Sequence, residues 1–97
     1  MIYEHAYITT DPDQRTEFEE SFDRARKYLL DANGGKTVEI VRSVDHAGLY
    51  LLRVGWDSVE DHTEAFAVST EGKLLAEAIG HYFTDTPQVV HFEDAPV

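Results

Sequence analysis

The sequence predicts an α+β fold in which four strands and two helices follow one another in the order β-α-β-β-α-β. Apolar runs of strand length occur at residues 2–9, 37–44, 49–56 and 88–93. Longer stretches with helical apolar spacing separate the first two runs and the last two, whereas only a short turn joins the middle two. This order is that of the ferredoxin-like split unit, which has an antiparallel sheet with helices on one face.

The first strand and helix are marked by clear local signals. Residues 2–9 carry apolar side chains at both parities, which suits a strand that is at least partly covered on both faces. Asp11, Pro12 and Gln14 combine an N-cap, a proline at the first helical position and a capping-box partner. The helix should end at Asn33, because two glycines follow. Its core-facing stripe is predicted to be Phe18, Phe22, Ala25 and Leu29.

The second half of the chain repeats this pattern with one interruption. Residues 45–48 form a turn that brings residues 49–56 back as a hairpin. Asp57 and Ser58 are N-cap residue types, so a second helix should begin there. Cap-type residues and a glycine at 69–72 predict a break, after which the helix resumes until Pro87 ends the connection. The apolar stripe of the resumed helix comprises Leu74, Leu75, Ala78, Ile79 and Tyr82.

Length and composition limit the classes of function. A chain of 97 residues is predicted to form one domain over residues 1–97. A formal net charge of -11 argues against binding nucleic acids or anionic membranes through a basic surface. The absence of cysteine excludes disulfides, thiol catalysis and thiolate metal sites. No apolar segment reaches the length of a membrane span and no export signal is recognised, so a cytoplasmic location is expected.

Apolar residues on both faces of the strands predict a second copy of the chain. Helices on one side cover only half of the sheet, so the other face needs a partner. Sheet-to-sheet association would give a homodimeric α+β barrel. The predicted interface consists of Ile2, Ala6, Ile8, Val38, Ile40, Leu49 and Leu51.

Four stretches resemble the antibiotic biosynthesis monooxygenase family, and together they span nearly the whole chain. They are E-H-A at 4–6, Y-L-L-R-V-G-W-D-S-V-E-D-H-T-E-A-F at 50–66, H-Y-F at 81–83 and V-V-H-F-E at 89–93. The resemblance implies a dimeric α+β barrel. It also implies a monooxygenase that oxidises a small aromatic or enolisable substrate with dioxygen, without metal or flavin, in a cavity between sheet and helices. No cofactor is therefore expected.

Three other interpretations compete with this one. In the first, the protein is purely structural, and its aromatic side chains fill the core and leave no cavity of ligand size. A non-catalytic barrel that binds small molecules or responds to stress would share the fold. The haem-degrading branch of the family uses an asparagine, a tryptophan and a histidine ligand, where this chain has His5, Phe66 and the region of residues 75–76. Because all three differ and no axial ligand is in place, haem degradation is the less favoured alternative.

Histidines are the candidate acid-base groups, since oxidation without a cofactor requires a deprotonated substrate. If odd positions of the first strand face the helices, His5 points into the cavity near His62. Their structural alternatives are a buried histidine with a satisfied hydrogen bond at His5, and a histidine bonded to Ser58 or Asp61 at position 62. The predicted substrate-binding residues are Tyr3, Tyr7, Tyr50, Trp56, Phe66 and His81.

The remaining polar residues are expected to be structural. Trp56 can also be a plug at the end of the sheet, and His81 and His91 can serve packing alone. By the same parity, Glu4 and Arg53 would form an ion pair on the barrel side of the sheet. No two of the five histidines have a close ligand spacing such as i and i+4, so no metal site is predicted.

Overall fold

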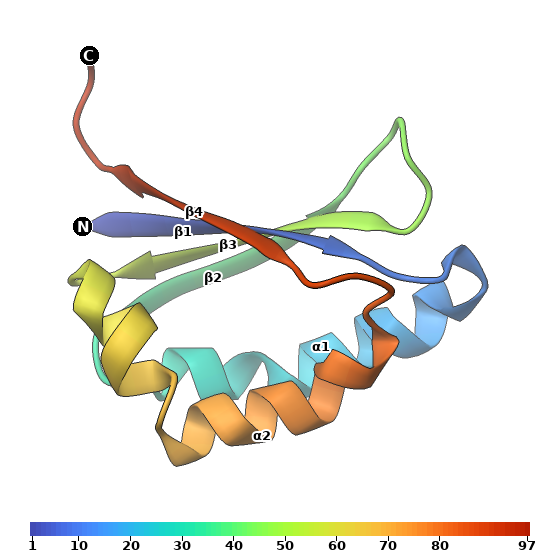
Figure 1. Ribbon diagram of the computed structural model, residues 1–97, viewed down its shortest axis with the longest axis horizontal. Coiled ribbons are helices and arrows are strands. Elements are labelled where there is room, and N and C mark those ends of the chain that lie inside the picture. Colours follow the sequence, from blue (N-terminus) through green and yellow to red (C-terminus); the bar gives the residue numbers. More distant parts are fainter.

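A four-stranded antiparallel sheet carries both long helices on one face in the computed structural model, which describes residues 1–97 (Figure 1). The strand order is β2-β3-β1-β4, which confirms the ferredoxin-like α+β fold. No helix is both long enough and apolar enough to cross a membrane. The strands are β1 (Ile2–Thr9), β2 (Gly35–Arg42), β3 (Leu49–Trp56) and β4 (Gln88–Glu93). The helices are α1 (Arg15–Leu30) and α2 (Thr70–Ile79), with short helical segments η1 (Pro12–Gln14), η2 (Asp61–Phe66) and η3 (Gly80–Tyr82).

The first helix begins as predicted, but with one tighter turn. The Asp11 side chain accepts a hydrogen bond of 2.9 Å from the backbone N–H of Asp13, and Pro12 opens a 3₁₀ turn. The α-helical part starts at Arg15, and the predicted capping-box role of Gln14 is wrong, since its side chain makes no capping hydrogen bond. The predicted stripe is confirmed, since Phe18, Phe22, Ala25 and Leu29 are all buried.

The even-numbered residues of β1 and β3 face the helices. Ala6 lies opposite Leu52, and Ile8 lies opposite Tyr50. All four residues are buried, whereas Tyr7 between them is 40% exposed. The prediction that odd positions of β1 face the helices is therefore wrong. A strand has a side-chain period of two, so one error of parity moves every side chain to the opposite face.

The predicted dimer interface is also partly wrong, because several of its residues face the helices. Ala6 and Ile8 belong to the core, and Val38 and Ile40 pack against it, so these four residues are not available for an interface. The predicted pair of Glu4 and Arg53 is wrong as well. Arg53 lies on the open face, where it pairs with Glu39 at 3.2 Å. The side chains of the open face include Tyr3, His5, Tyr7, Val41, Leu49, Leu51, Val90 and Phe92.

The connection from β3 to α2 is a π-helical segment followed by a break. The hydroxyl of Ser58 accepts a hydrogen bond of 3.2 Å from the Asp61 backbone N–H at the start of η2. The predicted break is confirmed at Ser69, whose hydroxyl accepts from Gly72 N–H at 3.0 Å and donates to the Phe66 carbonyl at 2.8 Å. A Cβ at Gly72 would lie 2.1 Å from that carbonyl oxygen, so only glycine fits there.

Candidate active site

A cavity of about 230 Å³ lies between the sheet and the second helical region. Its walls come from β1, β3, β4, α1, η2, α2 and the loop before β4. Most lining side chains are apolar, among them Ile8, Leu52, Phe66, Leu75 and Ile79. Glu4 and His62 are the two lining residues with titratable side chains. A cavity with an apolar wall and a few convergent polar groups is the usual form of a small-molecule site.

The Glu4 carboxylate is buried at this cavity and held through one of its oxygens. Oε1 accepts a hydrogen bond of 3.0 Å from Trp56 Nε1–H, and His62 Nε2 lies 3.4 Å from the same oxygen. Oε2 has no hydrogen-bond partner in the protein, and no unpartnered side-chain oxygen or nitrogen is fully buried. Oε2 is therefore not fully enclosed by the protein, and Glu4 is one of the residues that line the cavity.

Burial changes the acidity of Glu4. Desolvation raises the pKa of this carboxyl to about 7, and the hydrogen bond from Trp56 offsets part of that increase. Near neutral pH the group is thus present in both its protonated and its ionised form. A carboxyl with this pKa is suited to accept a proton from a substrate and to return it later.

His62 connects Glu4 to a second histidine. Its Nδ1 lies 2.8 Å from Nε2 of His91, and its Nε2 faces Glu4. Burial, with a smaller contribution from repulsion by His91, lowers the pKa of His62 to about 4, so this imidazole is neutral at pH 7. The register of the sheet explains the cluster, because His91 on β4 lies directly opposite Glu4 on β1. The π-helical segment η2 adds His62 from the helical side, and such segments are frequent at functional sites.

Trp56 forms the base of the site. It is fully buried, its ring stacks on His62 with centroids 5.4 Å apart, and Phe66 packs against it at 5.3 Å. The tryptophan thus fixes both polar groups through its ring face and its N–H. Of the two alternatives from the sequence, a sheet-end plug and a ring that stacks on substrate, the plug describes this position, because Trp56 is fully buried and is not among the residues that line the cavity.

Replacing Trp56 by phenylalanine should raise the pKa of Glu4 further. The change removes the N–H donor that favours the carboxylate form, and the smaller ring costs about 1–3 kcal/mol of stability. Titration of the Glu4 side-chain ¹³C resonance measures the effect. Tyr82→Phe is the control, because it removes a partly buried hydrogen bond of 3.2 Å to Ser21, outside the cavity. Equal midpoints in the Trp56 variant and the unmodified protein would contradict this role.

The structure brings together three of the eight residues predicted for the site, namely His62, Trp56 and Phe66. His5, Tyr3 and Tyr7 lie on the open face of the sheet, where the His5 ring packs on Phe92 at 4.7 Å. Tyr50 is buried on the helix side, but it donates a hydrogen bond of 2.6 Å to Glu19 instead of lining the cavity. His81 is exposed in η3.

Sequence reasoning missed Glu4 and His91 as members of the site. Glu4 shares its parity with Ala6 and Ile8, but the other parity of β1 carries Tyr3 and Tyr7, so the alternation gave no decisive signal at position 4. His91 carried no signal either, since the register of β4 decides what it meets. No group of three histidine, aspartate or glutamate side chains is arranged to hold a metal ion.

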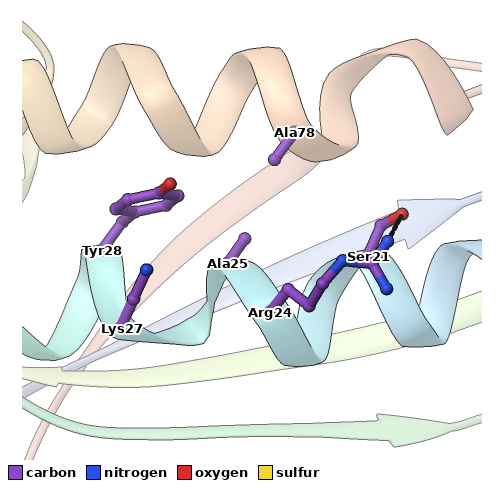
Figure 2. Close-up of a pocket in the computed structure, with 6 residues that line it drawn as sticks. All are labelled: Ser21, Arg24, Ala25, Lys27, Tyr28 and Ala78. Atoms are coloured by element: carbon purple, nitrogen blue, oxygen red, sulfur yellow. Dashed lines mark hydrogen bonds between the residues drawn. The ribbon is translucent and has the colours of Figure 1, made fainter.

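A larger hollow of about 360 Å³ lies between α1 and α2, away from this cluster. Figure 2 shows its lining, in which Tyr28 and Ala25 of α1 face Ala78 of α2. Arg24 is engaged there with Ser21 at 3.3 Å. It contains no carboxylate or histidine, so the smaller cavity at Glu4 is the better candidate for chemistry.

A sequence profile of the antibiotic biosynthesis monooxygenase family matches residues 1–73, and the chain belongs to this family. The uncharacterised protein YczJ of Bacillus subtilis (strain 168) is 31% identical over 94 residues, which cover 97% of this chain and 99% of YczJ.

Solved structures share the fold. A presumed antibiotic biosynthesis monooxygenase from Bordetella bronchiseptica superposes with a TM-score of 0.93 at 29% identity, over 98% of this chain and 97% of the other. A single-residue mutant of SnoaB, a cofactor-independent oxygenase from Streptomyces nogalater, gives a TM-score of 0.76 at 18% identity, over 99% and 94% of the two chains.

Proposed function

We propose that this protein is a cofactor-independent monooxygenase that oxidises a small, neutral aromatic or enolisable substrate in the cavity at Glu4. Family membership supports the reaction class. The observation that carries the proposal is that Glu4, a buried carboxyl whose Oε2 has no hydrogen-bond partner in the protein, lines an apolar cavity. Glu4 is the general base, in place of the histidine expected from the sequence.

The reaction can be balanced without an external reductant. Glu4 Oε2 accepts a proton from an activated CH₂ group, and the resulting carbanion transfers an electron to dioxygen. Recombination of the two radicals forms a carbon–oxygen bond and a peroxide. Protonation of this peroxide by the Glu4 carboxyl, followed by loss of the second hydrogen, releases water and leaves a carbonyl group. One CH₂ and one O₂ thus give one C=O and one H₂O.

The lining of the cavity defines the substrate class. It contains no lysine or arginine, so a carboxylate, sulfonate or phosphate on the substrate would have no countercharge. Its volume of about 230 Å³ is below the range of about 300–1,000 Å³ that is usual for ligand pockets. The substrate is therefore compact and uncharged, with its acidic C–H or O–H directed towards Glu4.

Oxygen uptake tests this function. Anthrone and smaller hydroquinones and naphthalenediols should each be examined with the purified protein in the presence of a chelator. The proposal predicts catalytic uptake of one O₂ per product molecule, with one oxygen atom from ¹⁸O₂ in the product. Saturable binding of these compounds without turnover would instead establish the non-catalytic binding barrel.

We also propose a homodimer formed through the open face of the sheet. This face exposes Tyr7, Val41, Val90 and Phe92, with fractions between 40% and 53%. The row of Tyr7, Leu51 and Val41 is apolar across three strands, while Arg53 and Glu39 form an ion pair beside it. Exposed apolar side chains on a sheet favour burial against a second copy, and stable interfaces bury about 800 Å² per partner.

Sedimentation at micromolar concentration should give a mass of twice 11.0 kDa. Leu51→Glu places a charge at the centre of the face, between Tyr7 and Val41, and should produce a monomer. Val68→Glu is the control, because Val68 is 87% exposed and lies outside this face. A monomeric unmodified protein would contradict the proposed interface.

A further inference from the structure

We propose that His62 and His91 form a proton relay that connects the buried Glu4 with solvent. The inference rests on the proposed role of Glu4 as the base and extends it to two residues that act on the substrate only through Glu4. Two separations carry it, a hydrogen bond of 2.8 Å between His91 Nε2 and His62 Nδ1 and a longer contact of 3.4 Å between His62 Nε2 and Glu4 Oε1. Catalytic hydrogen bonds are often long before a ligand binds and become shorter in the complex.

The outer end of the relay reaches solvent. His91 lies on β4, an edge strand of the sheet, and its side chain is half-buried. Its Nδ1 has no hydrogen-bond partner in the protein, and no unpartnered side-chain nitrogen is fully buried. Nδ1 is therefore accessible to water, while both nitrogens of His62 are directed at protein groups.

The proton transfers along these groups balance, and the resting states before and after them contain no charged imidazole. When Glu4 is ionised, His62 presents Nε2–H to the carboxylate and accepts from Nε2–H of His91. A proton from water adds to His91 Nδ1, the Nε2 proton of His91 moves to His62 Nδ1, and the Nε2 proton of His62 moves to Glu4. Both imidazoles are neutral before and after the transfer, and the reverse sequence ionises Glu4 again.

The relay gives Glu4 a route for proton exchange while a ligand occupies the cavity. Because the pKa of Glu4 is about 7, part of the protein carries a proton on this carboxyl at neutral pH, and that proton must leave before Glu4 can act as the base. A ligand that fills the cavity would exclude water from Glu4. Oε1 faces Trp56 and His62. The indole N–H can only donate, so His62 is the neighbour of Oε1 that can exchange a proton. His62 and His91 thus let Glu4 equilibrate with solvent while the substrate is bound.

The first test measures proton exchange without any substrate. Infrared spectroscopy after a rapid pH jump follows the carboxyl C=O band of Glu4, which is identified by its loss in Glu4→Gln. With the cavity filled by a non-reactive apolar probe such as naphthalene, His91→Ala should slow the appearance of this band by about tenfold or more. Imidazole in the buffer should restore the rate. An unchanged rate in His91→Ala would overturn the relay.

The second test uses turnover and separates the relay from simple packing. His91→Ala should lower kcat by about tenfold or more with little change in KM, and added imidazole should restore it. His91→Phe fills the same space, so it should be impaired without rescue, and His46→Ala in the exposed β2–β3 turn should behave as the unmodified protein.

Loss of kcat without imidazole rescue would assign His91 a structural role. Absence of turnover in the unmodified protein, with the infrared result intact, would remove the proposed function and leave the relay standing.

Discussion

Glu4→Gln should lower turnover by about 10²- to 10⁴-fold while substrate binding changes little, because the amide cannot accept the substrate proton. The glutamine carbonyl can still accept the 3.0 Å hydrogen bond from Trp56, so the geometry of the site is preserved. Oxygen uptake under saturating substrate measures kcat, and calorimetry measures binding. A matched substitution on the exposed side of α2, Glu77→Gln, should have no effect on either.

Full activity in Glu4→Gln would exclude this carboxyl as the base. His62 is then the remaining titratable group in the cavity. Its neutral state at pH 7 would make it the next candidate, and turnover would fall as the pH approaches about 4, where this imidazole becomes protonated. The shape of the pH profile therefore distinguishes the two bases.

Glu4→Gln should also stabilise the protein at alkaline pH. Glu4 has a pKa of about 7 in the folded protein against 4.5 in the unfolded chain, so the folded state binds more protons between these values. Stability due to Glu4 is therefore complete below pH 4.5 and falls as the pH rises through 7, by about 3 kcal/mol in total. This cost is absent in the glutamine variant. It is a large fraction of the roughly 5–15 kcal/mol that usually separates folded from unfolded proteins.

Urea unfolding at pH 5 and pH 8.5 measures this difference. The variant should gain about 2–3 kcal/mol relative to the unmodified protein between these two conditions. His62 contributes in the opposite direction, since its lowered pKa removes stability as the pH falls from 6.5 towards 4. Comparison of the two proteins at each pH cancels most of this contribution. A constant difference at both values would show that burial does not penalise the Glu4 carboxylate.

Local patterns in the sequence were sufficient to predict the elements of the fold. The 3.6-residue spacing of Phe18, Phe22, Ala25 and Leu29 identifies the buried side of α1 correctly, because each helix has a single core-facing stripe. The cap at Ser69 and the close approach at Gly72 likewise leave a recognisable local signal. These features depend on residues that are near one another in the chain.

The site depends on strand pairing, which the local pattern did not resolve. Residues 2–9 are apolar at both parities, so alternation alone cannot decide whether Glu4 or His5 faces the helices. The pairing of Ile2 with Trp56 decides this orientation. Trp56 lies on the helix side of the sheet, so Ile2 and the other even-numbered residues of β1, including Glu4, face that side as well. His91 reaches the site only through the register of β4 with β1. The resemblance to the family identified Trp56, His62 and Phe66. It did not identify Glu4, which Trp56 and His62 contact.

Titration of the Glu4 side-chain carboxyl carbon by ¹³C NMR tests the central claim most directly, because the role of Glu4 as base requires a proton affinity matched to neutral pH. Glu4→Gln assigns the resonance, and exposed glutamates such as Glu77 serve as internal references in the same spectra. A midpoint at about pH 7 is the predicted result. A midpoint near 4.5, the ordinary value for glutamate, would show that this carboxyl is not set apart by its surroundings and would contradict the account.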